Sequence, residues 1–396
     1  MAVAVESQKV RGHYQIIEGT HAASYAAKLA RVQVISAYPI TPSSGVVEKL
    51  SEMCESGELS ARFIKVESEH SAMASLIGAS ATGVRTFTGT SSQGLALMHE
   101  LLHWVSAARL PVVFVNVNRS LGPPWTVYAD HNDSLSQRDT GLMQVYCESN
   151  QDLLDMILIS FKVCEKVLMP CLLNMDAFFL SHTSEPVHLP AQEDVDRFLP
   201  PYQPEFKLDP KDPHTFGGFG PQPVYFEFRQ KMHWAQEQAK QEFKRAAREY
   251  AEFSGRLYDL VEPVQCEDAE IILVTAGTAA STARITVEEF RKRGVKLGLL
   301  KFLVLRPFPL EDVRRILGPA RKVAVVDRNI SYGASGIFYQ EIKAAMYHHG
   351  ERPPIFGFIA GMGGRDITPK TFAEIITYTM EHDRPNSEIL WIGAKP

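Results

Sequence analysis

The chain has 396 residues, 45% of them apolar, and a formal net charge of −5 from 41 basic and 46 acidic side chains. The length suggests two domains, and the interspersed charges form no basic stripe of the kind that binds nucleic acid. No run of about 18 apolar residues is present to cross a membrane, and the first residues lack a signal-peptide pattern, so we expect a cytoplasmic protein.

Up to about residue 185, apolar strand-like runs alternate with segments of helical spacing. This alternation predicts βαβ units, with helices on both faces of a parallel sheet. We expect strands at 32–37, 61–66, 84–88, 111–117 and 171–176. We expect helices at 20–30, 43–56, 70–82, 93–108, 134–142 and 151–167.

The composition changes after this block. Nine prolines between residues 184 and 223 predict an extended, irregular excursion. Residues 225–262 are rich in helix formers and mixed charge, which predicts one long helix. This helix either packs an apolar stripe on the body of the protein or binds a partner.

A second alternating block follows and predicts a smaller doubly wound domain. We expect strands at 271–275, 296–305 and 322–327, and helices within 277–293, 310–317, 333–348 and 369–381. Thr368 and Pro369 suit the N-cap and the first position of the last helix. The predicted architecture is α/β, with parallel-sheet domains at 1–185 and 266–396 joined by residues 186–265.

The stretch Tyr38-Pro39-Ile40-Thr41-Pro42-Ser43-Ser44 directly follows the first of these strands. Pro39 cannot continue a sheet ladder, and the two serines can cap the next helix. A strand end, a stiff loop and a helix start therefore meet at Thr41. Because ligands of open α/β sheets bind outside the carboxyl ends of the strands, we expect half of a ligand crevice here.

Polar residues also follow the next strands. Glu67 and Glu69 begin a helix of small residues, where a carboxylate either faces a ligand or only caps the helix. The turn over residues 88–94 has neither a P-loop nor a dinucleotide pattern, and it either binds polar ligand atoms or forms a capped turn. Arg119, at the end of the fourth strand, either binds a carboxylate or is exposed to solvent.

Two patterns argue against a metal centre on this chain. The five cysteines contain no Cys-x-x-Cys pair, which argues against zinc or an iron–sulfur cluster. Asp130-His131-Asn132-Asp133 has the right residue types for a metal, but we expect its side chains to point in different directions within a loop. The glycine turns at 275–278 and 331–336 are interpreted as punctuation of the fold.

Five segments, in this order, carry a family resemblance: Tyr38-Pro39-Ile40-Thr41-Pro42-Ser43, Val66-Glu67-Ser68-Glu69-His70-Ser71-Ala72, Ser92-Gln93-Gly94-Leu95-Ala96-Leu97-Met98-His99-Glu100, Asp133-Ser134-Leu135-Ser136-Gln137-Arg138-Asp139-Thr140-Gly141 and Leu305-Arg306-Pro307-Phe308-Pro309. They resemble the alpha subunits of multi-subunit 2-oxoacid:acceptor (ferredoxin) oxidoreductases, which include the pyruvate, 2-oxoisovalerate and phenylglyoxylate enzymes. The likeness covers roughly residues 18 to 370.

The resemblance implies an activity and a set of partners. Enzymes of this family use thiamine diphosphate to decarboxylate a 2-oxoacid oxidatively, usually onto coenzyme A. It implies that residues 1–185 form a pyrimidine-binding domain and that 266–396 form a transketolase C-terminal-like domain. A beta subunit would hold the diphosphate and Mg²⁺, and 4Fe-4S clusters would lie on the beta and ferredoxin-like subunits. A gamma subunit and, if NAD is the acceptor, a flavoprotein subunit would complete the complex.

The resemblance also implies roles for single residues. Glu69 matches the glutamate that hydrogen-bonds the aminopyrimidine ring and promotes its imino tautomer, with Pro39 as a further cofactor-binding residue. Thr41 matches the threonine that touches the carboxylate or keto oxygen of the substrate. Arg119 matches the arginine that pairs with that carboxylate.

One departure bears on the substrate. The loop after Arg119 contains Trp125 and Tyr128 and resembles the branched-chain members more than the pyruvate members. These side chains either line a roomier apolar pocket or pack against the beta subunit. We favour a branched-chain or aromatic 2-oxoacid slightly over pyruvate. The alternatives are a structural subunit without catalytic residues and, less favoured, a free-standing nucleotide-binding oxidoreductase.

Overall fold

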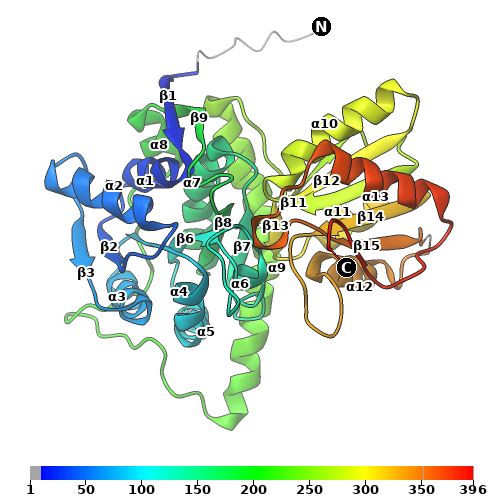
Figure 1. The fold of residues 1–396 in the computed structure, drawn as a ribbon. Coiled ribbons are helices and arrows are strands. Elements are labelled where there is room, and N and C mark those ends of the chain that lie inside the picture. Colours follow the sequence, from blue (N-terminus) through cyan, green and yellow to red (C-terminus); the bar gives the residue numbers. More distant parts are fainter. Residues whose placement is uncertain (1–9, 351, 396) are drawn as a thin grey trace, which may run out of the picture.

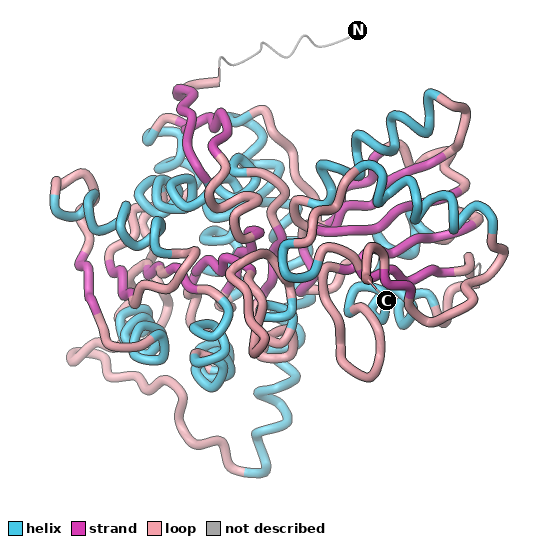
Figure 2. Tube along the Cα trace, viewed as in Figure 1, coloured by secondary structure: helices cyan, strands magenta, loops and turns pink. Residues whose placement is uncertain are grey.

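The computed structural model describes residues 10–350 and 352–395, which form two α/β units (Figure 1). In each unit strands run through the middle and helices lie on either side (Figure 2). These parallel sheets confirm the predicted α/β class. None of the helices in the described ranges is long and apolar enough to cross a membrane.

The parallel strands of the first unit form two groups, and the second group comes after the first along the chain. The first has the order β3 (Arg62–Lys65), β2 (Val34–Ala37), β4 (Thr86–Phe87). The second has the order β5 (Gly89–Thr90), β6 (Val113–Asn118), β8 (Cys171–Asp176), β7 (Met143–Tyr146). A strand from the second half of the chain, β13 (Val304–Arg306), pairs antiparallel with β7 and ties the two halves together.

Helices cover both faces of these strands. One face carries a large apolar core with α1 (Gly19–Leu29), α2 (Ser44–Glu55), α7 (Asn150–Val167) and part of α9 (Gln222–Ser254). The other face carries α3 (Glu69–Ala81), α4 (Ser92–Leu97) and α5 (His99–Ala107). Buried apolar residues on both faces fit strands such as β6, in which every residue is buried.

The second unit is built around one six-stranded sheet. Its order is β10 (Val261–Val264), β12 (Leu297–Phe302), β11 (Ile271–Ala276), β14 (Lys322–Asp327), β15 (Ile355–Ile359), β16 (Leu390–Trp391). Only β10 is antiparallel to its neighbour. One face is covered by α10 (Ala279–Lys292) and α13 (Pro369–Glu381), and the other by α11 (Leu310–Leu317) and α12 (Ile337–Met346). A 3₁₀ turn, η1 (Met362–Gly364), precedes α13.

The long connecting helix is shorter than predicted. α9 ends at Ser254 because Gly255 takes a left-handed conformation with φ of +71°, and β10 forms where the helix was expected to continue. The predicted apolar stripe is confirmed, since one face of α9 is buried through Ala235, Ala239, Phe243, Ala246, Ala247 and Tyr250.

The proline-rich excursion begins later than predicted. Residues 184–190 form β9 (Ser184–Pro190), which pairs antiparallel with β1 (Gly12–Glu18), and α8 (Gln192–Phe198) follows. A sheet of only two strands tolerates prolines because each strand has an open edge where no amide has to donate. The sequence did not reveal the distant partner strand, so the prediction was wrong here.

Several predicted element boundaries need correction. The helix expected at 93–108 is two helices that meet at Met98, and the one expected at 134–142 is the short α6 (Asn132–Leu135) followed by β7. The strand expected at 296–305 is interrupted at Leu303, and β15 and β16 were not predicted. The capping residues Thr368 and Pro369 are confirmed, with a capping box at Thr368. Ser43 occupies the N-cap of α2, but its hydroxyl donates to the Ile40 carbonyl at 2.8 Å instead.

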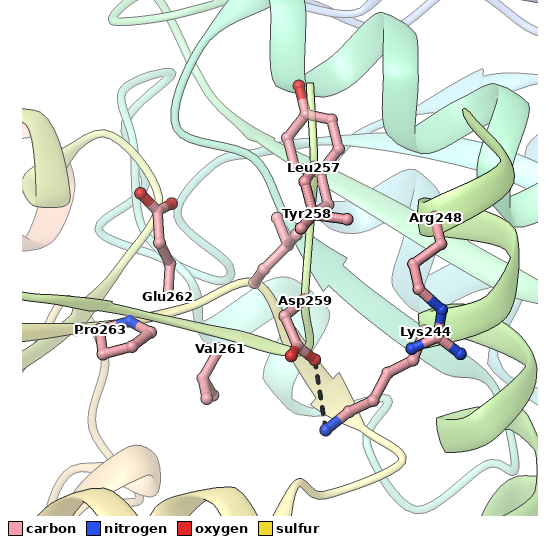
Figure 3. A pocket seen from close by; sticks show the side chains of 9 residues that line it. Lys244, Arg248, Leu257, Tyr258, Asp259, Val261, Glu262 and Pro263 are labelled. Atoms are coloured by element: carbon pink, nitrogen blue, oxygen red, sulfur yellow. Dashed lines mark ion pairs between the residues drawn. The ribbon is translucent and has the colours of Figure 1, made fainter. Parts of the chain in front are cut away.

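A cavity of about 210 Å³ lies where α9 meets β10 (Figure 3). Its lysine is already paired, because Lys244 Nζ lies 2.7 Å from Asp312 Oδ2 and 3.4 Å from Asp259 Oδ1. The phenol of Tyr258 donates to Asp155 Oδ2 at 2.8 Å. The lysine contacts tie α9 to the elements that follow it, and the tyrosine contact ties the segment after α9 to α7, so we interpret the cavity as a structural junction.

Candidate functional site

The three residues singled out in the sequence all lie just beyond strand ends of the first unit. Thr41 lies in the loop after β2, Glu69 is the first residue of α3 after β3, and Arg119 directly follows β6. Because β2 and β3 run parallel, their carboxyl ends meet at one edge of the sheet.

Arg119 joins the loop after β2 to the start of α4. Its Nη1 donates to the main-chain oxygen of Thr41 at 2.5 Å, and its Nη2 donates to Gln93 Oε1 at 3.0 Å. The residue is only 7% exposed, so the alternative of a solvent-exposed arginine is wrong. Burial lowers the pKa of Arg119, but a guanidinium remains charged in proteins. Its buried Nε has no hydrogen-bond partner, which leaves donor capacity for an anionic group.

The loop after Arg119 presents two aromatic rings. The guanidinium of Arg119 lies 5.2 Å from the ring centroid of Trp125, a cation–π distance. The Tyr128 ring lies 5.1 Å from that of Phe178. Trp125 is 59% exposed and Tyr128 is 49% exposed, so both rings leave apolar surface free, and Trp125 does so next to Arg119.

Glu69 is buried, with 6% of its surface exposed. The N-cap of α3 is the preceding residue, Ser68, whose hydroxyl accepts from the Ser71 amide at 3.1 Å. Glu67 is exposed, and its carboxylate accepts from the Ser71 hydroxyl at 2.7 Å. Ser68 and Glu67 therefore serve the helix start, and the Glu69 carboxylate is free for another partner. Burial raises the pKa of Glu69, which allows it to hold a proton more readily than an exposed glutamate.

Gly94 leaves the space beside this carboxylate. A Cβ added to Gly94 would lie 2.5 Å from Glu69 Oε1 and 2.7 Å from Thr90 Oγ1. The Thr90 hydroxyl is buried and has no hydrogen-bond partner. Gly94 also follows Gln93, which bonds Arg119. A continuous path therefore runs from Thr41 through Arg119, Gln93 and Gly94 to Glu69. No role was predicted for Gln93 or Gly94 from the sequence, although the glycine-rich turn that contains them was a signal.

Gly94→Ala should test this packing. We expect the new methyl group to displace the Glu69 carboxylate and to lower activity of the assembled complex at least about 10-fold, since misplacement by about 1 Å can reduce rates by about 100-fold. The control is Gly78→Ala on α3, where no atom lies within 4 Å of the added Cβ and activity should not change. Equal activities of the two variants would contradict a functional role for the space at Gly94.

The sequence also singled out Pro39 and the segment Asp130–Asp133. Pro39 and Thr41 are exposed, and the cofactor role of Pro39 stays a prediction. The side chains of the Asp130–Asp133 segment have separate partners: Asp130 accepts from the Asn132 amide at 2.8 Å, whereas His131 Nε2 lies 2.6 Å from Asp176 Oδ1. Throughout the ranges that the structure describes, no three His, Cys, Asp or Glu residues are placed to hold a metal ion.

Comparisons with known proteins identify the family of this chain. A family described as pyruvate flavodoxin/ferredoxin oxidoreductase, thiamine diphosphate-binding, matches residues 25–248, and pyruvate:ferredoxin oxidoreductase core domain II matches residues 269–372. Pyruvate synthase subunit PorA of Methanothermobacter thermautotrophicus is 46% identical over 96% of this chain and 98% of its own length. Ketoisovalerate oxidoreductase subunit VorA of Pyrococcus abyssi is also 46% identical, with the same coverage.

Two solved structures share the fold. The 2-oxoglutarate:ferredoxin oxidoreductase from Magnetococcus marinus superimposes with a TM-score of 0.75 over 94% of this chain and 66% of that chain, at 18% identity. A split-gene transketolase superimposes with a TM-score of 0.56 over 93% of this chain and 99% of that chain, at 11% identity. The fold and the matching family model thus define a protein with the architecture of thiamine-dependent enzymes.

The sequence relatives make the assignment more specific. The chain belongs to the pyruvate flavodoxin/ferredoxin oxidoreductase family, as an alpha subunit of the 2-oxoacid:ferredoxin oxidoreductase type. This confirms the family resemblance of the five sequence segments. It also makes the chain one subunit of an oxidoreductase complex.

Proposed function

We propose that this chain supplies the pyrimidine-binding half of a thiamine diphosphate site, in a complex that oxidatively decarboxylates a 2-oxoacid to its acyl-CoA and CO₂. Electrons would pass to iron–sulfur clusters on partner subunits. The observation that carries the proposal is the path from Thr41 through Arg119 and Gln93 to the buried Glu69 beside Gly94.

The residues around Glu69 fit the pyrimidine ring of this cofactor. When bound, thiamine diphosphate supplies the electron sink for breaking the bond to the substrate carboxylate. Glu69 would hold and share a proton at a ring nitrogen, a role that suits a carboxyl whose pKa is raised by burial. Gly94 keeps the space open, and the unpartnered Thr90 hydroxyl offers a further hydrogen bond.

Arg119 and Thr41 would bind the 2-oxoacid. The guanidinium carries the charge that complements the substrate carboxylate, and its buried Nε has no hydrogen-bond partner within the chain. The bond from Arg119 to the Thr41 carbonyl fixes the loop that bears the Thr41 hydroxyl. The hydroxyl would then donate to the carboxylate or keto oxygen of the substrate.

The remaining parts of the proposal concern partners and domains. A beta subunit would hold the diphosphate and Mg²⁺, and gamma and ferredoxin-like subunits would complete a cytoplasmic complex that uses coenzyme A. The acceptor would be ferredoxin, or NAD through a flavoprotein subunit. Within this chain, residues 1–185 would be the pyrimidine-binding domain, 186–265 the excursion and connecting helix, and 266–396 the transketolase C-terminal-like domain.

For the substrate we propose a branched-chain or aromatic 2-oxoacid, with pyruvate as the alternative. The support is the exposed apolar surface of Trp125 next to Arg119 and of Tyr128 in the same loop. Sequence identity does not separate the two alternatives, because it is 46% to both a pyruvate synthase subunit and a ketoisovalerate oxidoreductase subunit.

A substrate panel on the purified complex tests the proposal. Viologen reduction would be recorded with coenzyme A and either pyruvate, 2-oxoisovalerate, phenylglyoxylate or 2-oxoglutarate. We expect the highest kcat/KM for 2-oxoisovalerate or phenylglyoxylate, and a selective loss for these two in Trp125→Ala. Turnover of pyruvate alone would contradict the large-pocket interpretation. No turnover of any 2-oxoacid would contradict the proposed function.

A further inference from the structure

Asp133 is a fully buried carboxylate in α6 that the proposed reaction does not use directly. Its two oxygens accept five hydrogen bonds. Oδ2 accepts from the Ser92 amide at 3.1 Å, Asn116 Nδ2 at 3.0 Å and the Arg119 amide at 3.1 Å. Oδ1 accepts from Asn118 Nδ2 at 2.8 Å and the Ser134 amide at 2.7 Å. All five partners are donors, which suits a carboxylate acting only as an acceptor.

Two of these donors are main-chain amides of the candidate site. One belongs to Arg119 itself, and the other belongs to Ser92, which directly precedes Gln93 and Gly94. The same oxygen of Asp133 therefore fixes the start of α4 and the end of β6 relative to each other. These are the two segments that the side-chain bond from Arg119 to Gln93 connects.

The backbone at Ser92 requires such support. Ser92 has a φ of +46°, a left-handed conformation that is unfavourable for a residue with a side chain. The bond to Asp133 and the one bond that the Ser92 hydroxyl donates, to the Ser120 carbonyl or to Gln93 Oε1, stabilise this turn. Without Asp133, we expect the turn that carries Gln93 and Gly94 to relax from this unfavourable conformation.

We propose that Asp133 is a positioning residue for 2-oxoacid binding, because it sets the distance between Arg119 and the Ser92–Gly94 turn. This inference rests on the proposed function of Arg119 as the carboxylate-binding residue. Asp133 itself faces the protein interior and does not touch the substrate. Its effect reaches the substrate through the Arg119 main chain and through Gln93.

Asp133→Asn in the assembled complex is the main test. An amide offers only one acceptor oxygen, and its NH₂ group would face donors, so the variant loses either two or three of the five bonds in any orientation. We expect the KM for the 2-oxoacid to rise about 10-fold to 100-fold, with a smaller change in kcat. Thiamine diphosphate affinity, measured by quenching of protein fluorescence, should stay within about 3-fold, because Glu69 is not bonded to Asp133.

The control is Asp130→Asn, three residues away on the same segment. Asp130 is also buried, but its carboxylate accepts from the Asn132 amide and is not bonded to Ser92 or Arg119. Its KM should be close to that of the wild type. A purely structural effect of losing a buried carboxylate would instead change both variants alike and would alter cofactor affinity, which would overturn the inference.

A milder variant covers the case in which Asp133→Asn fails to assemble. Asn118→Ala removes one donor to Oδ1 and keeps the bonds from the Ser92 and Arg119 amides, so it should raise the KM about 3-fold to 10-fold. An unchanged KM in Asn118→Ala, or in an assembled Asp133→Asn, would overturn the positioning role while wild-type turnover upholds the proposed function. A wild-type complex without turnover would overturn both.

Discussion

Glu69→Gln should remove nearly all 2-oxoacid-dependent reduction of a viologen dye by the assembled complex. We expect a loss of about 10²-fold to 10⁴-fold, which is the range for a general acid–base group. Glutamine keeps the shape of the side chain next to Gly94 but cannot exchange a proton with a pyrimidine nitrogen. Binding of thiamine diphosphate should weaken much less than turnover, because the diphosphate contacts are proposed to lie on another subunit.

Glu67→Gln is the matched control for this variant. Glu67 lies two residues before Glu69, in the loop that leads into α3, is exposed, and accepts from the Ser71 hydroxyl, so its loss should leave turnover close to the wild-type value. A structural subunit without catalytic residues predicts equal activity for both variants. Normal turnover by Glu69→Gln would therefore favour that alternative and contradict the proposed mechanism.

The convergence of the three candidate residues was predictable from the sequence because it follows from local rules. Strands that run parallel bring their carboxyl ends to one edge, so the residues after them converge. Thr41, Glu69 and Arg119 each directly follow a strand or begin the next helix, and they lie along one path of contacts. The sequence did not decide whether Glu69 caps its helix, because Ser68 next to it can do so equally well.

The supporting contacts were not predictable because their partners are distant in sequence. Asp133 meets Ser92 across 41 positions, and no local pattern indicates that pairing. The same holds for β1, which pairs with β9 beyond residue 184, and for β13, which leaves the second unit to pair with β7. Proline content and the alternation of apolar runs are properties of one stretch of sequence, and they do not indicate which strand lies beside it in the sheet.

A buried charged cluster holds the two units together. Lys301 on β12 is 2% exposed, and its Nζ lies 2.7 Å from Asp152 Oδ2 and 2.8 Å from Glu148 Oε2. Both carboxylates belong to the first unit. Arg284 on α10 adds a bidentate pair to Glu148 at 2.8 and 2.9 Å. Two cations of the second unit thus neutralise carboxylates of the first.

Lys301→Met should destabilise the chain by about 3–5 kcal/mol, because it leaves buried carboxylates with too few positive partners. The measurement is the urea concentration at which this chain of the complex becomes sensitive to a protease. Lys296→Met is the control, since Lys296 is largely exposed and lies 3.5 Å from Glu270, and exposed pairs contribute about 0–1 kcal/mol. Equal urea midpoints for the two variants would show that the buried cluster contributes little to the stability of the chain.

The pH dependence of stability is an independent test of the same charged cluster. Burial alone would raise the pKa of Glu148, but the hydrogen bonds from Arg284 and the charge of Lys301 outweigh it and lower the pKa from 4.5 to about 2. A carboxyl with a lowered pKa in the folded state stabilises the fold above its unfolded pKa, and this contribution of about 3 kcal/mol is lost as the pH falls from about 4.5 to 2. Lys301→Met should raise the pKa of Glu148, so its smaller contribution should be lost at a higher pH than in the wild type. If the wild type and the variant lost stability in parallel over this window, Lys301 would not be the group that keeps Glu148 ionised.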